Sequence, residues 1–146
     1  MKRTVRPLAV LLVAAFLLLS LAGCTAIADS EAEELVRTCL DAFARGDYEA
    51  ADACFHPAAR QDAAFVGCRE YAETLRSRHR IDLTRGYTVT DWEGFATPGL
   101  SDAFYDVTFE GTVGGLRVAI SAVLYRDADG FGIFELTVAP IKETTI

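Results

Sequence analysis

The sequence is poor in residues that perform metal and nucleophilic chemistry. It contains two His, four Cys and one Trp, and its single Met is the first residue. It has no Gly-x-Ser-x-Gly nucleophile motif, no phosphate-binding glycine loop and no His-Glu-x-x-His zinc motif. The signatures of α/β-hydrolases, P-loop nucleotidases and zinc metalloproteases are therefore missing, and we predict neither a metal nor another cofactor.

Positive charge is also scarce. The 14 Lys and Arg residues are outnumbered by 21 Asp and Glu residues, which gives a net charge of −7. Three of the basic residues lie within the first 23 residues, so the rest of the chain has 11 basic and 21 acidic side chains and a charge of −10. Such a surface repels phosphate backbones, so we exclude nucleic acid as a partner. The length of 146 residues suits a single domain with one core.

The N-terminus combines a basic flank with an apolar run. Leu8 to Leu19 is shorter than the roughly 20 apolar residues that cross a bilayer, so a signal peptide is expected rather than a transmembrane helix. The run is followed by Leu21-Ala22-Gly23-Cys24, which resembles the bacterial lipobox. This resemblance implies cleavage after residues 1–23 and lipidation of Cys24. We expect an extracytoplasmic protein, anchored to the bacterial cell membrane, with residues 24–30 as the tether.

A helical pattern follows the tether. Ser30 and Glu33 form a capping-box pattern, and apolar residues then recur at helical spacing. Gly46-Asp47 ends this first helix, and Pro57 is expected to end the second because it lacks an amide hydrogen. The third pattern ends in a cluster of Arg and His. The predicted helices cover residues 31–45, 48–55 and 62–79.

After Ile81 the apolar period changes from helical to alternating, which is typical of half-buried strands. A loop is expected over residues 93–101, a two-residue hairpin at Gly114-Gly115 and a further turn over residues 127–130. The expected strands begin near Ile81, Tyr105, Leu116 and Phe131. Three N-terminal helices packed on an antiparallel sheet of about four strands make an α+β fold.

This order of elements resembles the nuclear transport factor 2-like superfamily. The resemblance rests on the leading helix, on the junction Ala44-Arg45-Gly46-Asp47-Tyr48-Glu49-Ala50-Ala51 and on the closing hairpin Leu124-Tyr125-Arg126-Asp127-Ala128-Asp129-Gly130-Phe131. It covers a domain over residues 31–140, with residues 141–146 as a tail. It implies a curved sheet that forms a cone with the helices, as in many bacterial lipoproteins.

Three kinds of role are expected, and the resemblance implies the first two. The first is a non-catalytic module that holds a small apolar ligand or docks a protein of the cell envelope. The second is an enzyme of the isomerase or cyclase type. Asp91 shares the inward alternation of Tyr87 and Val89, and Tyr105 lies on the inward face of the next strand, so the cone would hold Asp91 as base and Tyr105 as hydroxyl donor. The third is an accessory whose sheet face pairs with a second copy of the chain or another subunit. The residues predicted to line the pocket are Tyr71, Tyr87, Trp92 and Tyr105.

Three cysteines remain once Cys24 is acylated, and an extracytoplasmic location permits one disulfide among them. Folding back at Gly46-Asp47 would bring Cys39 opposite Cys54. Similar lipoproteins imply instead a bridge between Cys54 and Cys68, and we adopt this second pairing, which leaves Cys39 as a buried thiol.

A metal site is the competing interpretation of the same region. Cys54, His56, Cys68 and His79 offer suitable ligand atoms, but Cys-x-His lacks the usual paired spacing of zinc ligands. His79 follows a run of arginines, which is expected at the C-terminus of a helix. His56 precedes Pro57 and is expected on a surface loop.

Overall fold

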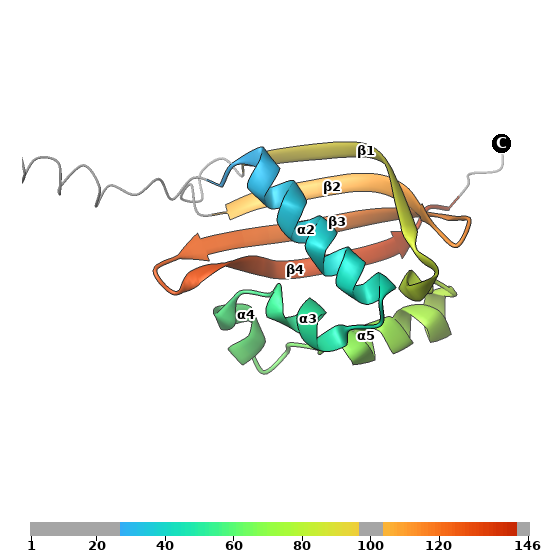
Figure 1. Cartoon of the computed structure of the whole chain (residues 1–146), viewed down its shortest axis with the longest axis horizontal. Coiled ribbons are helices and arrows are strands. Elements are labelled where there is room, and N and C mark those ends of the chain that lie inside the picture. Colours follow the sequence, from blue (N-terminus) through green and yellow to red (C-terminus); the bar gives the residue numbers. More distant parts are fainter. Residues whose placement is uncertain (1–26, 97–103, 143–146) are drawn as a thin grey trace, which may run out of the picture.

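The structure, a computed structural model, describes residues 27–96 and 104–142 and has an α+β fold (Figure 1). The predicted class and the four-stranded antiparallel sheet are confirmed. The signal peptide 1–23, Cys24 and residues 143–146 lie outside the described residues. No helix within the described ranges is long and apolar enough to cross a membrane.

The elements are α2 (Asp29–Ala44), α3 (Tyr48–Ala53), α4 (Pro57–Gln61), α5 (Cys68–Thr74), a π-helix (Leu75–His79), a 3-10 helix (Leu83–Arg85), β1 (Tyr87–Ala96), β2 (Phe104–Val113), β3 (Leu116–Asp127) and β4 (Gly130–Pro140).

The strands follow one another in sequence order, so β1 and β4 are the two edges of the sheet. Gly114 and Gly115 connect β2 to β3 with φ values of +55° and +86°, which explains why glycines form this predicted hairpin. Helix α2 crosses one face of the curved sheet, and the shorter helices lie beside β4 (Figure 1). Beneath α2 the strands bury alternate side chains, namely Tyr105, Val107, Phe109, Val113, Val118, Ile120, Ala122 and Leu124.

Helix α2 begins two residues earlier than predicted. Ala28 is the N-cap, and Glu31 Oε2 accepts a hydrogen bond from the Ala28 amide at 3.2 Å. Buried Ile27 precedes the cap and fixes the start of the helix against the core. Ser30, the expected cap, lies inside the helix, so residues 27–30 belong to the folded domain and the predicted tether is too long.

The predicted single helix over residues 62–79 is wrong in its first part. Residues 62–67 form turns and irregular backbone, and α5 begins only at Cys68. The Cys68 amide donates to Asp52 Oδ1 at 2.7 Å, so a carboxylate from α3 caps α5. Pro57, expected only to end a helix, starts α4, because a missing amide hydrogen is harmless at the first helical position.

The first predicted strand is shifted along the chain. Ile81 and Leu83 are buried as expected, but Leu83–Arg85 forms a 3-10 helix and the strand starts at Tyr87. The strand then continues to Ala96, so the loop predicted over residues 93–101 begins too early. Residues 97–101 of that loop lie outside the described residues.

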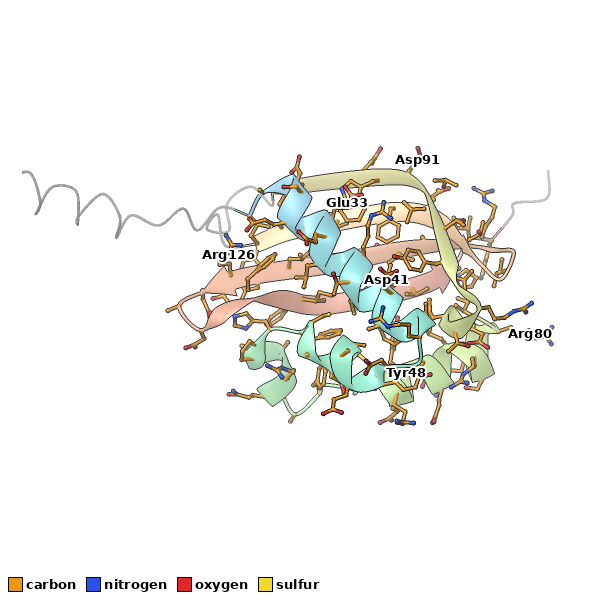
Figure 2. All side chains as sticks on the ribbon, in the orientation of Figure 1. Glu33, Asp41, Tyr48, Arg80, Asp91 and Arg126 are labelled. Atoms are coloured by element: carbon orange, nitrogen blue, oxygen red, sulfur yellow. The ribbon has the colours of Figure 1, made fainter. Side chains whose placement is uncertain are left out.

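A β-bulge in β1 reverses the alternation that the sequence predicts. Val89 pairs with Gly111 but Asp91 pairs with Glu110, so β1 contains one extra residue at this point. Trp92 therefore packs toward the core, whereas Asp91 is exposed (Figure 2). The prediction that Asp91 faces inward is wrong for this reason.

A short segment after α3 joins the helices to the edge strand β4. Phe55 forms a parallel bridge with Ile133. The His56 amide donates to the Ile133 carbonyl at 2.8 Å, and the Ile133 amide donates to the Cys54 carbonyl at 2.9 Å. His56 is fully buried by this pairing, at 0% exposure. Its predicted place on a surface loop is wrong, because the residues that bury it come from the distant β4 strand.

Candidate pocket beside the edge strand

A pocket of about 270 Å³ opens between β4 and the segment that links α4 to α5. Most of its surface is apolar, and a lining of aliphatic and aromatic side chains is typical of small-molecule sites. The lining residues are Phe55, Ala59, Asp62, Ala64, Phe65, Val66, Cys68, Tyr71, Phe134, Glu135 and Leu136.

The aromatic walls are positioned by two backbone features. Phe55 is fixed by its bridge to β4, and Phe65 packs against it edge to face with ring centroids 5.3 Å apart. On the opposite side, Ile133 pairs with Leu124, whereas Glu135 pairs with Val123. Phe134 is the extra residue of this bulge. Both walls are therefore set by the irregular backbone of β4 and its neighbouring segment.

Tyr71 ties α5 to β4 at one side of the pocket. Its hydroxyl accepts a hydrogen bond from the Val138 amide at 2.8 Å, which satisfies a backbone donor of the edge strand. Burial raises the pKa of Tyr71 above its usual value. The hydroxyl is thus a neutral hydrogen-bonding group near neutral pH, and it holds the pocket walls together.

The charged side chains that line the pocket are acidic. Asp62 and Glu135 are the charged residues among the described residues that line it, and both are exposed. An anionic ligand would meet these carboxylates without a lining Arg or Lys to pair with. The geometry therefore suits a small ligand that is apolar and either neutral or cationic.

Of the four predicted pocket residues, Tyr71 is the one that lines this pocket. The Tyr87 hydroxyl donates to Asp41 Oδ1 at 2.9 Å, and the Tyr105 hydroxyl donates to Asp29. Burial, and next to it the hydrogen bond to the carboxylate, raises the pKa of each of these two tyrosines to about 12. The hydrogen bonds of both tyrosines therefore join α2 to the sheet.

Trp92, the fourth predicted residue, also packs under α2. Its ring stacks on Phe109 with centroids 5.2 Å apart, and the Arg37 guanidinium lies 5.9 Å from the indole centroid. Buried Leu40 of α2 belongs to the same apolar core as Trp92, and the ring of buried Phe43 packs edge to face on Tyr48 and Tyr71. These contacts make the region under α2 a packed core.

The structure does not bring Asp91 and Tyr105 together. Asp91 pairs with Glu110, five positions along β2 from Tyr105, which corresponds to about 16 Å of strand. Asp91 is exposed, whereas Tyr105 is buried beneath the start of α2. A base and a hydroxyl donor acting on one substrate need to lie within hydrogen-bond reach of it, and this pair does not.

The three described cysteines are buried free thiols. Cys39 Sγ donates to the Ala51 carbonyl at 3.9 Å, and Cys54 Sγ donates to the Ala50 carbonyl at 3.4 Å. The neighbouring Cys54 thiol, and after it burial, raises the pKa of Cys39, whereas the Cys39 thiol lowers the pKa of Cys54. Burial, followed by the neighbouring Asp52 carboxylate, raises the pKa of Cys68. Cys54 thus contacts the alternative partner Cys39, and the bridge to Cys68 stays a prediction.

Both ring nitrogens of His56 form hydrogen bonds. Nδ1 accepts a hydrogen bond from the Ala58 amide at 3.0 Å, and Nε2 lies 2.8 Å from Asp127 Oδ1. The Nδ1 acceptor fixes the ring hydrogen on Nε2, so neither nitrogen is left for a metal or a substrate. Among the described residues, no group of three or more His, Cys, Asp or Glu side chains is placed to hold a metal ion.

Sequence reasoning missed most of the pocket because its walls come from irregular backbone. Phe65 and Val66 fall inside the predicted helix over residues 62–79, and the prediction of the last strand assigns no particular position to Phe134. One signal was present in the sequence: the adjacent apolar residues Ile133 and Phe134 break the strict alternation of the last strand and indicate a bulge.

Comparisons of the chain with protein-family models, with curated proteins and with solved structures give no match.

Proposed function

We propose that the chain is a bacterial lipoprotein, anchored by Cys24 on the outer side of the cell membrane, whose domain of the nuclear transport factor 2-like type binds a small apolar ligand without catalysing a reaction. The lipobox resemblance supports the anchor. The order of helices and strands supports the family assignment.

The observation that carries the binding role is the pocket beside β4. It has aromatic walls from Phe55, Phe65 and Phe134, and these come from three separate segments joined by backbone pairing and ring contacts. Pre-formed apolar pockets of this kind bind small molecules by removing apolar surface from water. The ligand would displace water from the rings, while Asp62 and Glu135 at the lining disfavour anions.

A binding role fits the chemistry of the lining better than catalysis does. The Cys68 thiol has a raised pKa and is 1% exposed, so it is a poor nucleophile. Tyr71 uses its hydroxyl as an acceptor for a backbone amide. The two carboxylates of the lining, Asp62 and Glu135, are exposed to solvent rather than enclosed by the apolar side chains that surround many catalytic carboxylates.

Ligand binding can be tested on the chain produced from Thr25 onward, with the neutral dye N-phenyl-1-naphthylamine as probe. The Ala64→Phe variant should fill the pocket and lower dye affinity about tenfold. Ala63→Phe is the matched control, because Ala63 is the exposed neighbour and does not line the pocket. Equal dye binding by both variants would contradict the pocket. Absence of dye binding in the parent chain would favour the docking of an envelope protein.

The anchor can be tested separately by membrane fractionation of cells that express the full chain. Cys24→Ala removes the thiol that receives the lipid and should release the protein from the membrane fraction. Thr25→Ala, a change at the next residue, should leave it there. Retention of the Cys24→Ala variant in the membrane would refute the lipid anchor without affecting the pocket.

A further inference from the structure

Three aromatic rings form a cluster on the sheet face opposite α2. Phe104, Tyr125 and Phe134 make up this ring cluster. Phe104 and Tyr125 stack with centroids 4.6 Å apart, and the Phe134 centroid lies 6.3 Å and 6.1 Å from theirs. The strand neighbours Tyr105 and Leu124 are buried beneath α2, so the alternation of strands places Phe104 and Tyr125 on the outer face.

The ring cluster is unlike the rest of the outer face. Phe134 is 42% exposed, which is unusual for a phenylalanine in a strand. Phe104 and Tyr125 are half-buried, and the Tyr125 ring also packs edge to face on buried His56 with centroids 4.9 Å apart. Exposed apolar patches with polar surroundings mark interaction surfaces. Val66, at 47% exposure, continues the apolar surface across the pocket that Phe134 helps to line. Farther along β2, β3 and β4, the exposed outward residues are polar, namely Thr108, Glu110, Ser121 and Thr137, whereas the apolar outward residues Ala119, Val123 and Ala139 are half-buried.

The folded domain begins at the same end of the sheet. Tyr105, the neighbour of Phe104, binds Asp29 in the first turn of α2. Arg126, the neighbour of Tyr125, donates from Nη2 to Glu31 Oε1 at 3.0 Å. Figure 1 shows the start of α2, the start of β2 and the β3–β4 turn at one end of the molecule, and Figure 2 shows Arg126 there.

Very little chain separates this end from the predicted anchor. Thr25 and Ala26 are the two residues between Cys24 and buried Ile27. Three residue steps span at most about 11 Å, even when fully extended. A lipid on Cys24 would therefore hold the start of α2 within about 11 Å of the bilayer surface. At such a distance, even a weak contact with the membrane is favoured by the high effective concentration.

We propose that the ring cluster rests in the interfacial layer of the bilayer that holds the Cys24 lipid. This inference depends on the lipid anchor proposed above. Aromatic side chains favour the membrane interface, where their rings leave water without entering the hydrocarbon core. The partner is a lipid surface, because the short tether fixes that surface at this end of the domain.

The charges near the ring cluster specify the kind of contact. Asp127 and Asp129 lie in the β3–β4 turn, and Glu135 follows Phe134. These carboxylates are repelled by anionic headgroups, so the contact depends on the rings and should be weaker on vesicles rich in anionic lipid. The pocket shares Phe134 with the cluster, so its mouth would face the membrane. The ligand class that follows is an apolar molecule dissolved in the bilayer.

Quenching of an introduced indole by brominated lipid tests this orientation. The full-length lipidated chain is reconstituted in vesicles of dibrominated phosphatidylcholine, in a Trp92→Phe background that removes the one native Trp. Phe134→Trp reports on the ring cluster. Leu116→Trp is the matched control, because Leu116 is also apolar and 37% exposed but belongs to the hairpin at the opposite end of the sheet. We expect about threefold stronger quenching for Phe134→Trp than for Leu116→Trp.

Flotation of the same vesicles separates the two proposals. Equal quenching at both positions, in a chain that floats with the vesicles, would overturn the membrane contact and leave the anchor intact. A chain that does not float would overturn the anchor, and the membrane contact with it. Quenching at position 134 that decreases when anionic lipid is added would support both the ring contact and the predicted repulsion.

Discussion

His56 Nε2 donates a hydrogen bond to Asp127 Oδ1 over 2.8 Å, and this pair joins the start of α4 to the β3–β4 turn. The same Asp127 oxygen accepts the Asp129 amide at 2.8 Å. Partial desolvation raises the pKa of Asp127, but hydrogen bonds from the Asp129 and Gly130 amides and from His56 outweigh it and leave that pKa below its usual value. The carboxylate therefore organises the turn and the buried imidazole at the same time.

Replacement of His56 should be strongly destabilising. His56→Ala removes the acceptor that caps the Ala58 amide, leaves Asp127 without its partner and opens a cavity at a fully buried position. We expect the free energy of unfolding to fall by about 3 kcal/mol, as measured by urea denaturation. His79→Ala, at an exposed position of the π-helix, should change it by less than about 0.5 kcal/mol. Similar losses in both variants would contradict the role of His56.

Gly132 should tolerate no side chain. A Cβ atom at this position would lie 2.4 Å from the His56 nitrogen and 2.8 Å from the Phe55 carbonyl carbon, both of them backbone atoms. Gly132→Ala must therefore separate β4 from the segment that forms a wall of the pocket, and we expect a loss of about 3 kcal/mol together with the loss of dye binding. In the control Gly67→Ala, the nearest atom to Cβ is Asp52 Oδ2 at 3.9 Å, so the loss should stay below about 1 kcal/mol. Unimpaired dye binding by Gly132→Ala would show that the wall is not needed.

The parts of the fold that the sequence predicts are those with local causes. Gly114 and Gly115 identify their hairpin because the backbone there needs positive φ, and the alternation along β2 and β3 identifies the face that α2 covers. Periodicity by itself does not fix the position of an extra residue, even where adjacent apolar residues such as Ile133 and Phe134 signal one. The bulges after Val89 and at Phe134 were therefore not predicted. The first bulge leaves Asp91 exposed, and the second places Phe134 in the wall of the pocket.

The burial of His56 escaped prediction for a different reason. Its environment is made by Ile133 and Asp127, which are far away in the sequence and lie nearby only once the sheet has formed. The local sequence, with Pro57 next, is typical of a loop. Contacts between distant segments of the chain determine whether a single residue is buried. They also bring together the walls of the pocket, whose residues the sequence pattern places in separate helices and strands.

Alkaline pH should weaken the fold through Tyr87 and Tyr105. The pKa of each is about 12 in the folded chain, because burial and a carboxylate of α2 disfavour the phenolate, against about 10 in the unfolded chain. The folded state thus retains protons that the unfolded state loses. The resulting stabilisation is complete below pH 10 and is lost as the pH rises from about 10 to about 12. Urea midpoints measured across this range should fall steadily.

A variant with both tyrosines replaced by phenylalanine isolates this contribution. It should lose some stability at pH 8, because Asp41 and Asp29 lose their hydroxyl donors, but its urea midpoint should fall less steeply above pH 10. Buried Cys39 and Cys68 contribute to the alkaline slope in both proteins, since burial also raises their pKa values. Identical slopes in the variant and the parent would show that the tyrosines titrate alike in the folded and unfolded chains.

The disulfide prediction can be decided by alkylation without reductant, followed by mass mapping of the mature protein. A bridge between Cys54 and Cys68 closes a loop of about 15 residues and should stabilise the oxidised chain by about 3 kcal/mol. We expect a peptide linked through Cys54 and Cys68, with Cys39 labelled only after denaturation. Cys39→Ser should then keep the extra stability of the oxidised chain, and Cys68→Ser should lose it. Because the Cys54 thiol contacts Cys39 in the reduced structure, a Cys39–Cys54 peptide is the result that would prove this pairing wrong.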